Sequence, residues 1–121
     1  MSLDPRALLA ERLADTAQGF KKGNHRVWRF ARRTLSALIS IVSDEDIVLT
    51  GSVFAVSNDF FEAQTKAEGG KEFLKELGET LEMLSDAFKT NESGKIDSLL
   101  RKFTMQVNSR WLQVLKQGTP Q

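Results

Sequence analysis

Apolar residues recur at three- and four-residue intervals over the last third of the chain, and this spacing constrains the fold more than any other feature. After Gly69-Gly70 one series steps by four, four, three and four positions: Phe73, Leu77, Leu81, Leu84 and Phe88. A second series follows Ser93 and contains Ile96, Leu99, Leu100, Phe103, Val107, Trp111, Val114 and Leu115. Both spacings place apolar side chains on one face of an α-helix. Because only the segment from Thr90 to Gly94 joins these helices, they are predicted to pack antiparallel.

Two further helices are predicted near the N-terminus. Asp4 is a suitable N-cap and Pro5 suits the first helical position, so the first helix begins there and ends at Gly19 or Gly23. The second runs from about Asn24 to Val42. The apolar residues of the first are Leu8, Leu9, Leu13 and Ala17; those of the second are Val27, Ala31, Leu35, Leu38 and Val42, with Phe30 and Ile41 at the margin. The chain therefore predicts an all-α, single-domain bundle of four or five helices over residues 1–121, with a frayed tail from Gly118.

The segment after Val42 admits two structures. Ser43 and the acids at 44–46 are typical of a helix start, which predicts a third helix continuing through Phe61. Val, Ile, Phe and Thr around a central glycine also fit a short hairpin from Ile47 to Val56. The helix would carry its main apolar face on Leu49, Val53, Val56, Phe60 and Ala63, and a second stripe on Ile47, Phe54 and Phe61. The second stripe implies either central burial or an interface, most simply a symmetric dimer.

Composition excludes several classes of site. The chain has 40% hydrophobic and 27% charged residues and contains no Cys, which rules out disulfides, thiolate nucleophiles and Cys-based metal centres. His25 is the only His and does not suffice for a usual zinc site. No apolar run approaches the length of a membrane span, and the first residues lack the features of a signal peptide. We therefore expect a cytoplasmic protein with no catalytic residue, no metal and no cofactor.

Charge is distributed unevenly along the chain. Residues 1–33 carry eight Lys or Arg against three acids, whereas residues 34–121 carry nine against thirteen. The densest stretch contributes Lys21, Lys22, Arg26, Arg29, Arg32 and Arg33, with Trp28 among them. Arginine suits phosphate because its planar fork donates two parallel hydrogen bonds, and an aromatic ring beside cations can stack on an unpaired base. The pattern equally fits the solvated face of an ordinary amphipathic helix, with its arginines paired to four acids of the fourth helix: Glu72, Glu76, Glu79 and Glu82.

These observations favour one function and leave an alternative open. The favoured function is a non-enzymatic helical interaction module that acts through protein–protein contacts, including a homodimer. The alternative is a nucleic-acid-binding accessory protein that uses the basic face of the second helix. Binding to a membrane surface through the same face is less favoured, because the opposite face of that helix is needed for the core.

Overall fold

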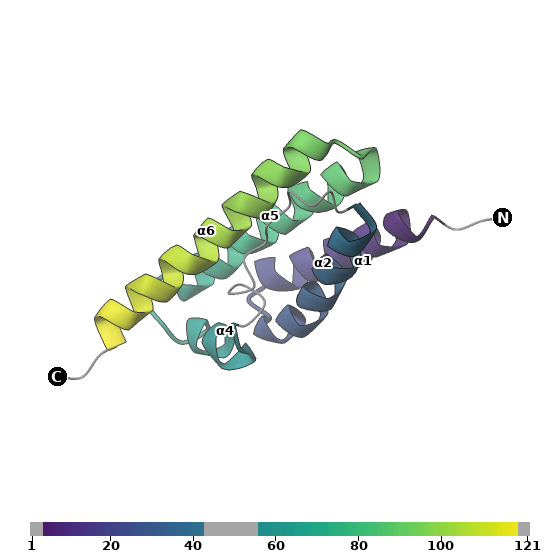
Figure 1. Cartoon of the computed structure of the whole chain (residues 1–121). Coiled ribbons are helices and arrows are strands. Elements are labelled where there is room, and N and C mark those ends of the chain that lie inside the picture. The colour runs from purple at the N-terminus through teal and green to yellow at the C-terminus, as the bar shows by residue number, and fades with distance from the viewer. Residues whose placement is uncertain (1–3, 43–55, 119–121) are drawn as a thin grey trace.

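The computed structural model describes residues 4–42 and 56–118, and every regular element in these two ranges is helical (Figure 1). The described elements in chain order are α1 (Pro5–Lys21), the short 3-10 helix η1 (His25–Val27), α2 (Trp28–Val42), α4 (Asn58–Gln64), α5 (Gly70–Thr90) and α6 (Ser93–Gly118). The five α-helices of the described ranges share one hydrophobic core. The prediction of an all-α bundle is confirmed.

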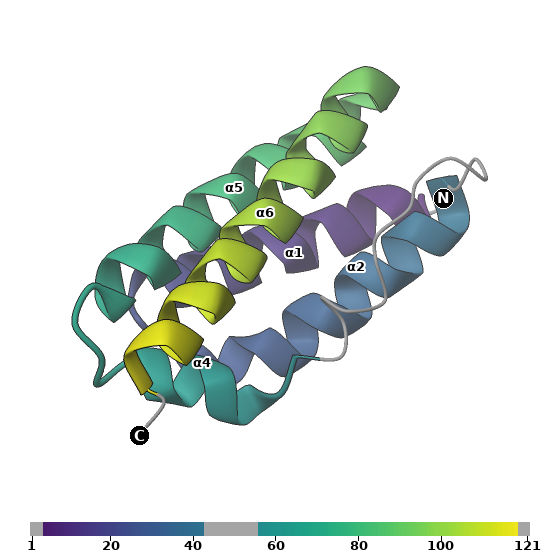
Figure 2. The ribbon, with the colours of Figure 1, turned by 60° about the vertical axis from the view of Figure 1, so that its left-hand side comes forward.

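Helix α1 holds the bundle together. It contacts α5 along its length on one side and α2 on the other, while α5 pairs with α6 (Figure 2). The short α4 contacts η1 and the neighbouring α5. As a result α2 and α5 lie on opposite sides of α1, which keeps the arginines of α2 apart from the glutamates of α5.

The first two helices begin with side-chain caps. Asp4 Oδ1 accepts a hydrogen bond of 3.0 Å from the backbone N–H of Arg6, and Pro5 occupies the first position, so the predicted start of α1 is confirmed. Asn24 Oδ1 likewise accepts from the N–H of Arg26 at 3.1 Å, but this cap opens the 3-10 turn. The prediction of an α-helix from Asn24 is therefore wrong by about one turn, since α2 begins at Trp28.

The prediction of one long third helix that continues through Phe61 is also wrong, because the chain is not helical at Ser57. Ser57 is extended, with φ −80° and ψ 161°, and α4 begins at Asn58. Ser57 and the Asn58-Asp59 pair after it are residues that favour helix starts over helix interiors, which explains the interruption. The hairpin alternative, and the positions of Ser43, Ile47 and Phe54, lie outside the described residues.

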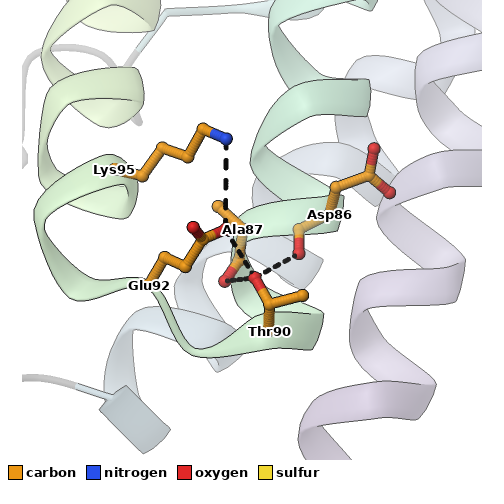
Figure 3. A network of polar contacts seen from close by, with 5 residues as sticks. All are labelled: Asp86, Ala87, Thr90, Glu92 and Lys95. Carbon is orange, nitrogen blue, oxygen red and sulfur yellow. Dashed lines mark hydrogen bonds and ion pairs between the residues drawn. The ribbon is translucent and has the colours of Figure 1, made fainter.

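A tight turn joins α5 to α6 (Figure 3). Asn91 adopts a left-handed conformation with φ 56°, which Asn tolerates better than most residues, and its N–H bonds back to the end of α5. The hydroxyl of Thr90 lies 2.7 Å from Glu92 Oε2 and 3.2 Å from the carbonyl oxygen of Asp86, and Lys95 Nζ is 4.0 Å from Glu92. The predicted short connection between the last two helices is confirmed.

Aromatic rings fill the centre where α2, α4 and α6 meet. The ring of Trp28 lies 4.6 Å from that of Phe61 and 6.1 Å from that of Phe103, between centroids. Its indole N–H donates to the carbonyl oxygen of Val56 at 2.9 Å, which satisfies the one polar atom of this buried side chain. Trp28 thereby ties α2 to the segment that enters α4.

Most residues on the predicted apolar faces of the last two helices are buried, whereas Val114 is half-buried and Trp111 is exposed. All five predicted α5 residues are buried, as are Ile96, Leu99, Leu100, Phe103 and Val107 of α6. Trp111 is 41% exposed, and its ring lies 5.2 Å from that of Phe60, between centroids. The inward position at this turn belongs to Arg110, so the prediction of Trp111 as core is wrong. The side chains of Val42 and Leu115 lie outside the described part of the chain.

Helices α1 and α5 approach closely at two small residues of α5. A Cβ placed on Gly78 would lie 2.6 Å from the carbonyl oxygen of Ala17, which is too close for any real contact. One heptad later the hydroxyl of Ser85, which is fully buried, donates to the carbonyl oxygen of Ala10. Helix α1 therefore packs backbone-close against α5, and the positions along the contact are fixed by a glycine and a serine.

Truncation of the aromatic core should be costly. Phe103→Ala removes a fully buried ring that contacts Trp28, and should destabilise the fold by about 3–5 kcal/mol, the range for large core truncations. Met105→Ala, two residues away but 67% exposed, is the control and should change the free energy of unfolding by less than about 0.5 kcal/mol. Equilibrium denaturation in urea measures both, and equal effects would contradict the assigned core.

The two glycines 78 and 94 should respond in opposite ways to alanine. Gly78→Ala should destabilise the protein by about 1–3 kcal/mol through overpacking, despite a gain of up to about 1 kcal/mol in helix propensity. Gly94→Ala places its Cβ in open space within α6 and should be neutral or slightly stabilising. Denaturation midpoints compare the pair, and a stable Gly78→Ala variant would show that the two helices do not approach this closely.

Candidate functional site

The four arginines of the basic stretch all lie on the exposed side of η1 and α2. These residues are Arg26, Arg29, Arg32 and Arg33. Within residues 4–42 and 56–118, no ion pair reaches Arg26, Arg29 or Arg33. The structure thus leaves the guanidinium groups of these three in contact with solvent.

The predicted pairing of these arginines with α5 does not occur for Arg26, Arg29 and Arg33. Helix α1 lies between α2 and α5 and keeps the two charged surfaces apart. Glu82 instead pairs with Lys21 of α1, at 2.7 Å, and also accepts from Gln18. Lys21 therefore faces α5 and does not belong to the exposed arginine face, whereas Lys22 is exposed.

The aromatic residue that accompanies the arginines is Phe30. Trp28 is fully enclosed in the core, so the prediction that it could stack on a base is wrong. Phe30 follows two positions later, about 200° around the helix, and is 57% exposed. In the sequence pattern Phe30 falls only at the margin of the apolar face. Its spacing from Arg26 and Arg33, four positions back and three forward, is the signal that groups the three residues on one side of the helix.

Phe30 stands between two surface hollows. One, of about 500 Å³, lies between α1 and α2 and is lined by Arg12, Asp15, Thr16, Val27, Phe30, Arg33 and Thr34. The other, of about 380 Å³, is lined by His25, Arg26, Arg29, Phe30, Asn58 and Glu62. Together the linings hold four arginines against two acids, so the surroundings of Phe30 are net positive.

An apolar stripe continues from Phe30 along α2. Ala37 and Ile41 follow at steps of seven and four, and Ile41 is 50% exposed. We name the combination of Phe30, Ile41 and the four arginines Arg12, Arg26, Arg29 and Arg33 the Phe30 surface. Arg12 comes from α1 and was not identified from sequence, because only packing against α2 brings it to this groove.

The predicted interface stripe is not exposed where the structure describes it. Phe61 is fully buried, with its ring 5.7 Å from that of Phe20 and 4.6 Å from that of Trp28. An interface role for Phe61 is therefore wrong, and the alternative of central burial holds for this residue. Ile47 and Phe54 lie outside the described residues.

One buried charge was missed by sequence analysis. Arg110 of α6 is 7% exposed and donates to the side chain of Gln64 and to the carbonyl oxygen of Glu68. Gln64, at the end of α4, is itself fully buried. No periodicity marks either residue, because each is polar and each is held by a partner more than forty positions away.

The described residues offer neither a metal cluster nor a membrane span. Among them, no three His, Asp or Glu side chains gather closely enough to hold a metal ion. In the same ranges, no helix combines the length and apolar character needed to cross a bilayer.

In comparisons with known proteins, no family model, curated protein or solved structure matched the chain.

The ion pair between Lys21 and Glu82 should make stability depend on pH. The hydrogen bond from Lys21 is the largest of the influences that lower the pKa of Glu82 from its ordinary value of 4.5; desolvation opposes it, and the charge of Lys21 and the bond from Gln18 add to it. Because the folded pKa is the lower one, the stabilisation is complete above the unfolded pKa and is lost as pH falls through the folded pKa.

Glu82→Gln should therefore be less stable than wild type at neutral pH, and the two should converge in acid. Thermal unfolding across the acidic range measures the difference. Glu79→Gln is the matched control, since Glu79 forms no ion pair with a described residue. A Glu82→Gln deficit that persists unchanged at low pH would contradict the assigned cause.

Proposed function

We propose that the chain is a non-enzymatic interaction module whose Phe30 surface binds an acidic, amphipathic segment of a protein partner. The observation that supports it most is the exposed Phe30 itself. This ring stands between two hollows and among arginines, of which Arg26, Arg29 and Arg33 have no ion pair in the described part of the chain. Apolar anchors ringed by charge are the usual make-up of a small protein-binding surface.

The apolar stripe indicates what shape of partner would fit. Phe30, Ala37 and Ile41 follow helical spacing along one side of α2, next to the groove with α1. An amphipathic helix carries its apolar residues at the same spacing and would lay them along this stripe. Carboxylates on the flanks of such a helix would reach Arg33 on one side and Arg12 on the other.

Nucleic acid is the alternative, and one feature of the same surface disfavours it. Ile41, half exposed beyond the arginines, gains nothing from a phosphate backbone but is useful to an apolar side chain. A protein partner uses both the charged and the apolar residues.

A display library of helix-prone peptides tests the proposal directly. Selected peptides should carry acidic residues beside apolar residues at helical spacing. Phe30→Ala should weaken their binding by roughly tenfold or more, since burying such a ring contributes about 1.5–3 kcal/mol. Met105→Ala, which alters an exposed apolar residue of α6, is the control and should leave affinity unchanged.

Three results would contradict the proposal. The first is that no peptide is enriched, and the second is that enriched peptides still bind Phe30→Ala. The third is binding of RNA or DNA in place of peptide, with log affinity falling against log salt at a slope of about −2 to −5, which would establish the nucleic-acid alternative. The double change Arg29→Glu and Arg33→Glu should abolish binding in either case, so Phe30→Ala and the salt slope carry the decision.

A further inference from the structure

Arg110 is a buried cation without a counter-charge among the described residues. Its Nε donates to Gln64 Oε1, its Nη1 to Gln113 Oε1 at 3.2 Å, and its Nη2 to the carbonyl oxygen of Glu68 at 2.9 Å. All three acceptors are neutral. No carboxylate in residues 4–42 or 56–118 comes within 4.0 Å of this guanidinium. Buried charges in proteins are normally paired with an opposite charge, whereas this guanidinium lies over the ring of Phe73, 5.9 Å from its centroid.

The guanidinium also keeps unused donors. Arginine has five N–H groups, and three are engaged, which leaves one on each of Nη1 and Nη2. These two nitrogens are a pair that binds a carboxylate bidentately. The present bonds hold Arg110 in place through its Nε side and one N–H of each terminal nitrogen.

The surroundings of Arg110 favour a negative group. Arg110 lines an open groove of about 680 Å³ between α5 and α6. Gly69, the N-cap of α5, lies beside it: a Cβ built there would be 3.4 Å from Nη1. Gly69 supplies no side-chain hydrogen bond to cap α5, and the positive end of the helix dipole lies here, together with Glu72 of the first turn.

We infer that this groove binds a small ligand by its carboxylate group, held by Arg110, with a cationic group at the ligand's other end. Four other charged residues line the groove: the acids Glu72 and Glu76 of α5, and Arg101 and Lys102 of α6. Arg101 is paired with Asp97 at 3.2 Å. The two acids are the groups that would attract the ammonium end of the ligand. Phe73 and Met105 supply apolar contact between the charged groups. The ligand class is thus a zwitterion of the amino-acid type.

A structural role for Arg110 is the competing explanation. Its bonds to Gln64 and Glu68 fasten the α4–α5 connection to α6, and that alone would account for its burial. The two roles differ in one respect. A purely structural Arg110 shows no saturable response to carboxylates, whereas a binding residue does.

These roles are separated by adding a ligand stepwise to the full chain and recording a nitrogen–proton correlation NMR spectrum at each step. The probe is ε-aminocaproate; acetate and hexylamine are matched probes that each lack one charged group, and sodium chloride holds ionic strength constant. The signals to follow are the amides of Gly69 and Gly70 and the side-chain Nε–H of Arg110. Gly94, in open space near the start of α6, and Gly23, before the basic stretch of η1 and α2, report on the rest of the molecule.

We expect saturable shifts at Gly69, Gly70 and Arg110 with ε-aminocaproate, weaker ones with acetate and none with hexylamine. Arg110→Gln should abolish the response, and Arg29→Gln should leave it intact. Glu76→Gln should weaken the binding of ε-aminocaproate by about two- to fivefold, as expected for the loss of a partly exposed ion pair, and should leave the affinity for acetate unchanged.

Shifts that rise linearly and equal those from chloride would overturn the inference, as would saturable shifts confined to Gly23. Binding that survives in a folded Arg110→Gln variant would do the same. Should that variant fail to fold, Arg110→Lys retains the charge without the planar fork and must still weaken binding. None of these readouts depends on the Phe30 surface, so the outcome is separate from that of the proposed function.

Discussion

The close contact between α1 and α5 is the constraint on which the rest of the bundle depends. Gly78 lets the backbone of α1 pass within van der Waals distance of α5. One heptad further along α5, the hydroxyl of Ser85 donates a hydrogen bond to the carbonyl oxygen of Ala10. Leu13, Ala17 and Phe20 of α1 are then fully buried in the core, where the Phe20 ring lies 5.7 Å from that of Phe61 of α4. Because α5 lies against one side of α1, α2 is left with the opposite side.

That placement explains why the charges of the chain stay segregated. The chain has nearly equal numbers of cations and anions, and pairing between α2 and α5 would have neutralised its two halves. With α1 between them, Glu82 of α5 pairs with Lys21 at the end of α1, while Arg26, Arg29 and Arg33 form no ion pair with any residue that the structure describes. The neighbours of a helix follow from packing details such as Gly78, which the apolar periodicity of the sequence does not report. The helices themselves were therefore predictable, while the partners of the arginines were not.

The two aromatic residues of the basic stretch show the same limit at the scale of single side chains. Trp28 and Phe30 are both aromatic and both lie among cations; the sequence pattern groups Trp28 with the binding candidates and places Phe30 at the margin of the apolar face. Its burial depends on the carbonyl of Val56, which accepts the indole hydrogen bond from a segment 28 positions away. Arg110 is the reverse case, a charge drawn inward by acceptors from the α4–α5 connection. Periodicity predicts which face of a helix is apolar, but long-range polar contacts decide such exceptions.

The exposure of Phe30 follows from the burial of Trp28. With Trp28 fixed between Phe61 and Phe103, the helical rotation of about 200° over two residues turns Phe30 outward. The fold therefore requires that position 30 face solvent, and it does not require an aromatic residue there. A single exposed apolar residue is ordinary on a protein surface. Phe30 differs because Ile41 extends the same stripe and because both hollows beside the ring are flanked by arginines that form no ion pair within residues 4–42 and 56–118. The stability of the fold does not explain that combination. A partner with apolar and acidic residues would explain both parts of it, because its apolar residues would contact Phe30 and Ile41 and its carboxylates would pair with the arginines.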